Sequence, residues 1–92
     1  MAVYTWAEGT SDADIAEFTG MLERLPARIP EIRGYAFGPD LGLVPGNGDF
    51  GLVAELDDEA AFRTYVAHPD HQPVLAWVAA HVAHRSAVQL SI

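Results

Sequence analysis

The sequence of 92 residues has no cysteine and no lysine. Small secreted domains usually depend on disulfide bonds, so the lack of cysteine indicates a reducing compartment, and we expect a cytoplasmic protein. Because lysine is missing, five arginines supply all the positive side-chain charge against thirteen acidic residues, which gives a net charge of −8. Such a chain repels phosphate backbones, so we expect no nucleic-acid partner.

Long apolar runs and cofactor motifs are also missing. The longest apolar run, Val74 to Ala80, is far shorter than the about 20 residues that cross a bilayer, and no signal peptide is recognisable. We therefore expect a soluble protein with no membrane partner. The glycine-rich segment 42–48 lacks the pattern of a phosphate-binding loop, and no dinucleotide fingerprint occurs, so we expect no cofactor. This segment is typical of a hairpin connection, with a cavity lid as the alternative.

Apolar residues, by contrast, make up half of the chain, and two Trp, three Tyr and four Phe are among them. The length allows one hydrophobic core, so residues 1–92 are predicted to form a single domain. A chain of this size buries only about 60–65% of its extended surface, which favours self-association.

The first half of the chain predicts a strand followed by an amphipathic helix. Residues 2–6 are rich in β-forming side chains. Ser11 and Asp14 have the spacing of a capping box. Apolar residues then recur at helical spacing: Ile15, Phe18, Leu22 and Leu25. We expect this helix to be stopped by Pro26 and Pro30.

The middle of the chain predicts two more strands, over 32–38 and 50–56, joined by a loop at 41–48. The second of these is a nearly continuous apolar run, which is typical of a strand inside a sheet. Asp57 is then the expected N-cap of a helix with its body at 60–68. Pro69 interrupts the helical pattern, and a further helix is expected over 71–81.

A closing strand is predicted over 86–92, with Val88, Leu90 and Ile92 on one face. The element order is therefore β-α-β-β-α-(α)-β, which predicts an α+β ferredoxin-like fold. Helices on one side of a four-stranded sheet leave the other face bare. We therefore expect a homodimer in which a second copy covers the apolar row of the closing strand.

Two segments carry a family resemblance. The stretch DDEAAFRTYVAHPDHQPV, residues 57–74, and the stretch GYAFGPDLGL, residues 34–43, resemble the stress-responsive dimeric α/β-barrel family, often called Dabb. The resemblance extends over nearly the whole chain in order and length. It implies two ferredoxin-like subunits whose sheets face each other to close a barrel.

The resemblance also implies a chemistry. One plant member, olivetolic acid cyclase, closes a linear polyketide by an intramolecular aldol reaction without a cofactor. Its general base is the second His of the HPxH motif, which is His71 here, and the tyrosine that holds that ring falls on Tyr65. A functional histidine in its first strand would fall before Met1, so this chain lacks it. The implied ligand is a small hydrophobic or aromatic carbonyl compound.

Two other functions stay open: a stress-response or ligand-binding dimer without turnover, and a cofactor-free monooxygenase of the antibiotic-biosynthesis type. In the catalytic interpretation, His71 and Tyr65 act in a pocket lined by four further residues: His68, Trp77, Phe18 and Trp6. In the alternative interpretation, His68 caps a turn and the aromatic residues are core. His81 and His84 are too few for a metal site, so we expect no metal.

Overall fold

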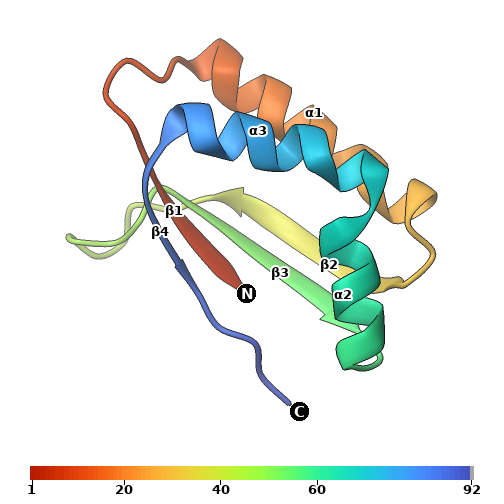
Figure 1. Cartoon of the computed structure of the whole chain (residues 1–92). Coiled ribbons are helices and arrows are strands. Elements are labelled where there is room, and N and C mark those ends of the chain that lie inside the picture. The colour runs from red at the N-terminus through yellow and green to blue at the C-terminus, as the bar shows by residue number, and fades with distance from the viewer. Residues whose placement is uncertain (92) are drawn as a thin grey trace.

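Four strands form one antiparallel sheet, and the helices cover only one of its faces (Figure 1). The computed structural model describes residues 1–91. Its elements, in chain order, are β1 Ala2–Trp6, α1 Asp12–Arg28, β2 Ile32–Pro39, β3 Phe50–Leu56, α2 Glu59–Ala67, the short 3₁₀ helix η1 Pro69–His71, α3 Gln72–His81 and β4 Val82–Ala87. The strand order β2-β3-β1-β4 gives the predicted ferredoxin-like fold.

The two faces of the sheet differ in residue size. Alternate residues of β1 and β3, Ala2 and Tyr4 together with Phe50 and Leu52, are buried beneath the helices. Helix α1 packs on the same core through the apolar stripe that the sequence spacing predicts: Phe18, Leu22 and Leu25. The opposite face carries mostly small residues, which the strand register places side by side: Val3, Gly34, Ala36, Gly38, Gly51 and Val53. No element of the described chain covers this second face (Figure 1).

Helix α1 begins as predicted but ends later. Ser11 and Asp14 form the capping box, with the Asp14 N–H donating to the Ser11 hydroxyl at 3.1 Å. Pro26 was expected to stop the helix, yet α1 continues to Arg28. A proline near a helix end loses only its own N–H bond, and its fixed φ is helical, so the last turn can form around it. The helix then ends where the Ile29 N–H bonds the Leu25 carbonyl.

The N-cap of α2 is Asp58 rather than the expected Asp57. The Asp58 carboxylate accepts the Ala61 N–H at 2.8 Å, so it satisfies one of the free donors of the first turn. Asp57 instead accepts from the Arg33 side chain at 3.1 Å. This shift moves the body of the helix to Glu59–Ala67.

The closing strand was predicted four residues too late. It is β4, which starts at Val82 directly after α3 ends at His81. Val88 lies beyond it, although its N–H still donates to the Met1 carbonyl at 3.0 Å. Leu90 is 64% exposed, and Ile92 lies outside the described residues. The strand was missed because its sequence, VAHRSA, lacks the apolar alternation that residues 88–92 show.

Candidate functional site

The turn between α2 and α3 brings His71 back onto the last turn of α2. Pro69 cannot continue the α2 hydrogen-bond ladder, and the chain forms the single 3₁₀ turn of η1. His68 caps that turn, because its Nδ1 accepts the Asp70 N–H at 3.1 Å. The His71 N–H donates to the His68 carbonyl at 2.9 Å. As a result the rings of Tyr65 and His71, six positions apart, have centroids 4.4 Å apart.

His71 is held by one ring nitrogen and free at the other. Its Nδ1 lies 3.2 Å from the Val66 carbonyl oxygen, which can only accept, so Nδ1 carries the proton and Nε2 the lone pair. Within residues 1–91, the Nε1 of Trp77 is the one side-chain polar atom that is fully enclosed and lacks a hydrogen bond. The Nε2 of His71 has no hydrogen-bond partner there, so this nitrogen keeps accessible surface. The side chain as a whole is only 6% exposed.

A second tyrosine, which the sequence did not indicate, extends the cluster. The hydroxyls of Tyr35, in β2, and Tyr65 lie 2.7 Å apart and share a hydrogen bond. Burial raises the pKa of both phenols, and their hydrogen bond raises that of Tyr35 further while it opposes the shift at Tyr65. Both hydroxyls are therefore protonated near neutral pH. One O–H is used in the bond between them, which leaves the other O–H to donate to an oxygen that gains negative charge.

Arg85 was also missed by the sequence reasoning. It lies in β4 opposite Tyr4 of β1, and antiparallel partners point to the same face. Burial raises the pKa of Tyr4, and the charge of the nearby Arg85 guanidinium opposes this shift. A lone arginine at an inward position of a strand was the available signal. It was hidden because the residue fell between the predicted helix and the predicted strand.

Three of the expected pocket residues pack against each other in the core. The rings of Phe18 and Trp77 stack with centroids 4.4 Å apart, and Trp6 meets Trp77 edge-on at 5.5 Å. This stack leaves Phe18 without exposed surface. Their packing fits the core interpretation, and a role for them or for His68 in lining a pocket stays a prediction.

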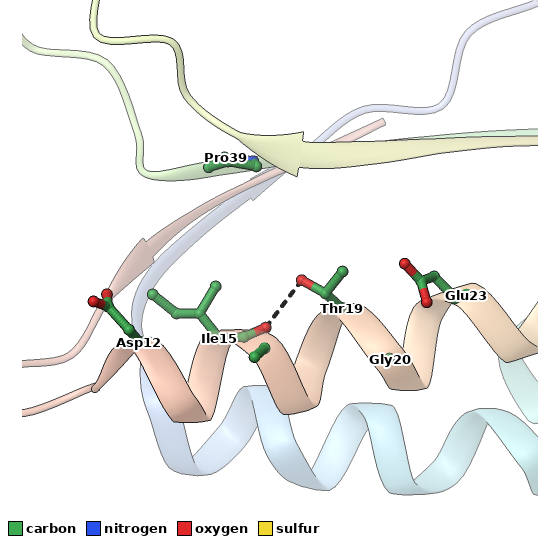
Figure 2. A pocket seen from close by; sticks show the side chains of 7 residues that line it. Asp12, Ile15, Thr19, Gly20, Glu23 and Pro39 are labelled. Atoms are coloured by element: carbon green, nitrogen blue, oxygen red, sulfur yellow. Dashed lines mark hydrogen bonds between the residues drawn. The ribbon is translucent and has the colours of Figure 1, made fainter.

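Two hollows lie elsewhere on the surface. The first, about 560 Å³, lies between α1 and the end of β2, and Figure 2 shows its lining: Asp12, Ile15, Ala16, Thr19, Gly20, Glu23 and Pro39. The second, about 440 Å³, lies near Gly38, Gly51 and the loop that follows β2. Neither is lined by His71 or Tyr65. A ligand that reaches Nε2 of His71 must therefore use a different opening.

The two C-terminal histidines have separate surroundings. His81 Nδ1 lies 2.9 Å from the Trp77 carbonyl oxygen, and its Nε2 lies 4.0 Å from an Asp14 oxygen. His84 lies in β4, where its Nε2 is 3.4 Å from the Ser86 hydroxyl. In the part of the chain that the structure describes, no group of three or more His, Asp or Glu side chains could hold a metal ion. Nor is any described helix long and apolar enough to cross a bilayer.

Comparison with known proteins relates the fold to a family. The family model for the stress responsive A/B barrel domain, Dabb, matches residues 2–92. A dimeric ferredoxin-like protein of unknown function from Thermobifida fusca is 45% identical, with a TM-score of 0.93 over 99% of this chain and 86% of that one.

More distant structures have the same fold. A dimeric ferredoxin-like protein from Jannaschia is 20% identical, with a TM-score of 0.86 over 99% of this chain and 94% of that one. A Dabb family protein from Mesorhizobium loti is 21% identical, with a TM-score of 0.70 over 98% of this chain and 93% of that one. No match was found among curated proteins.

The environment of His71 predicts how stability depends on pH. Burial lowers the pKa of His71, the charges of Arg85 and His68 lower it further, and the bond to Val66 opposes the shift. Below about pH 6.5, the usual pKa of histidine, the unfolded chain therefore binds more protons at this ring than the folded one. His71 should lower the free energy of unfolding as the pH falls from 7 towards 5, and this contribution should be absent above that range.

Thermal melts of the wild type and of His71→Gln between pH 5 and 8 check this prediction. Glutamine keeps an N–H donor but does not titrate, so the variant should lose less stability than the wild type on acidification. His84→Gln, on the other face of the sheet, is the matched control for loss of an imidazole. Parallel pH curves for wild type and His71→Gln would contradict the assignment.

Proposed function

The chain belongs to the stress-responsive A/B barrel (Dabb) family, and from this premise we propose that it forms a homodimer that binds a small aromatic or carbonyl compound, with His71 as general base. The observation that carries the proposal is the state of the His71 ring. One nitrogen is anchored on the Val66 carbonyl, and the other keeps its lone pair and some accessible surface beside Tyr65.

The bare face of the sheet supports the homodimer. Most of its residues are small, and Val3 and Val53 expose 41% and 42% of their surface in the single chain. The side chain of Glu55 lies over Gly34, but Gly38 and Gly51 have open space above them, so the backbone of a second sheet can come close there, at the spacing of about 10 Å usual for stacked sheets. The related proteins from Thermobifida fusca and Jannaschia are both described as dimeric.

The cluster around His71 supports a cofactor-free reaction of the aldol type. Such a reaction needs a base that removes a carbon-bound proton and a donor that stabilises the resulting enolate oxygen. The neutral imidazole supplies the base at Nε2. The hydrogen-bonded phenols of Tyr35 and Tyr65 together supply one free O–H donor. The enolate carbon would then attack a second carbonyl of the same molecule, and the imidazolium would return the proton to the new alkoxide.

The inward-facing residues of β1 offer no second histidine for the proposed reaction. They carry Ala2, Tyr4 and Trp6, and no histidine. The proposal therefore gives the base role to His71 alone. A non-catalytic ligand-binding dimer is the second candidate, and it is favoured by the close packing of Tyr65 and His71, each 6% exposed.

Proton abstraction from carbon can be measured without knowledge of the natural substrate. We expect the wild type to catalyse deuterium incorporation into phenylacetone in D₂O, followed by NMR, and His71→Ala to lower the enzymatic rate by about 100-fold or more, the usual contribution of a general base. His84→Ala, which removes an imidazole outside the cluster, should keep the wild-type rate. A rate in His71→Ala equal to that of wild type would contradict the base assignment.

The two tyrosines give a second, matched pair. Tyr65→Phe and Tyr35→Phe delete the same hydrogen bond, and each should lower the free energy of unfolding by about 1 kcal/mol. Only Tyr65 contacts the His71 ring, so Tyr65→Phe should slow deuterium exchange more than Tyr35→Phe does. Equal rates with a large fall in melting temperature for both variants would favour the non-catalytic candidate.

The homodimer predicts a mass twice the 9.9 kDa of the chain in light scattering at micromolar concentration. Val53→Glu should shift the protein towards monomer, because it places a charge on the face that meets the second copy. Leu75→Glu on α3 is the matched control, since Leu75 is also 42% exposed but lies on the helical side. A wild-type monomer, or equal masses for the two variants, would contradict this interface.

A further inference from the structure

Arg85, an exposed residue of the edge strand β4, brings a positive charge to the edge of the inner face of the sheet. Its partner across the β1–β4 ladder is Tyr4, whose side chain points into the core beneath the helices. The guanidinium therefore lies on the side of the sheet where Tyr35, Tyr65 and His71 gather. Burial lowers the pKa of His71, and the charge of Arg85 lowers it further. Burial raises the pKa of Tyr4 and Tyr65, and the charge of Arg85 opposes that rise.

This arginine has no acidic partner, although the chain is strongly acidic. Arg33 pairs with Asp57 at 3.1 Å, and Arg63 pairs with Glu59 at 3.5 Å. Within residues 1–91, Arg85 forms no ion pair with any Asp or Glu, and the same is true of Arg24 and Arg28 on α1. Arg85 differs from those two in its place opposite Tyr4. A guanidinium presents a rigid fork of N–H donors that matches the two oxygens of a carboxylate.

The hydroxyl of Tyr4 adds a second polar group next to Arg85. Tyr4 is 4% exposed, and its ring meets Phe18 edge-on with centroids 5.7 Å apart. Within residues 1–91 its hydroxyl has no side-chain hydrogen bond and is not among the enclosed atoms that lack a partner, so it keeps accessible surface. The Tyr4 hydroxyl can donate a hydrogen bond, and the Arg85 guanidinium has no acidic partner. Together with the neighbouring aromatic side chains, these groups fit a ligand that carries an anionic group on an aromatic or polyketone skeleton.

We propose that Arg85 and Tyr4 form a carboxylate subsite beside His71, so that the compound bound by this protein is an acid rather than a neutral ketone or ester. The inference rests on the proposed function and names its ligand class. With the carboxylate held by Arg85, the remainder of the molecule lies towards the Tyr65 and His71 rings. The site thereby selects an anion in a chain whose net charge of −8 would otherwise repel it.

A pair of probes that differ only in charge tests the subsite on the full chain. Binding of 2,4-dihydroxybenzoate and of its methyl ester is measured by calorimetry or by ligand-observed NMR at pH 7.5. We expect the acid to bind at least about tenfold more tightly than the ester, because a hydrogen bond to a charged group contributes more than one to a neutral group. Arg85→Gln should remove this preference by weakening the acid alone, and Arg85→Lys should retain part of it.

Arg24→Gln is the matched control, since it makes the same change in net charge on the exposed surface of α1, away from the cluster. It should preserve the preference for the acid. Equal affinity for acid and ester, or the same loss in both glutamine variants, would overturn the subsite and leave the proposed function standing. Failure of both probes to bind the wild type would overturn the ligand site at His71, and the subsite with it.

Discussion

A four-stranded sheet has two faces, and this chain provides helices for one of them. Every large aromatic of β1, α1 and α3 is directed to that covered face, where Tyr4, Trp6, Phe18 and Trp77 interlock. The bare face carries mostly glycine, alanine and valine, together with Glu55 of β3 and His84 and Ser86 of β4. The same alternation along the strands therefore sets the core, the face that we propose meets a second copy, and the side of the sheet on which polar groups can meet His71.

The short turn after α2 brings the His71 and Tyr65 side chains together. Pro69 ends the α-helical ladder, and the 3₁₀ turn that follows directs His71 back against Tyr65. The Val66 carbonyl, which lies in the last turn of the helix, accepts a hydrogen bond from Nδ1–H and thereby sets the tautomer. This hydrogen bond to a backbone carbonyl of the last helical turn thus leaves the lone pair on Nε2, where a general base requires it.

Much of the fold could be predicted from the sequence, because the signals are local. The capping box at Ser11, the apolar stripe of α1 and the apolar run of β3 each depend on neighbours within a few positions, and each prediction is confirmed. The errors arose where two local signals competed. Residues 88–92 alternate better than β4 itself, whose inward position holds the arginine that faces Tyr4.

The candidate site could be predicted only in part. Tyr65 and His71 were found through the motif that includes Pro69, and the structure places their rings in contact. Tyr35 is 30 positions from Tyr65, and no local pattern signals a hydrogen bond that depends on how β2 meets α2. Trp6, Phe18 and Trp77 could not be assigned to pocket or core from sequence, since both interpretations need the same large apolar side chains.

The proposed chemistry depends on one state of His71, a neutral imidazole with its proton on Nδ1 and a lone pair on Nε2. Nitrogen-15 NMR of protein labelled at histidine reports the protonation of each ring nitrogen directly, and His71→Gln identifies the resonance. At pH 7 we expect a protonated Nδ1 and an unprotonated Nε2 for His71. A proton on Nε2, or on both nitrogens, would contradict it.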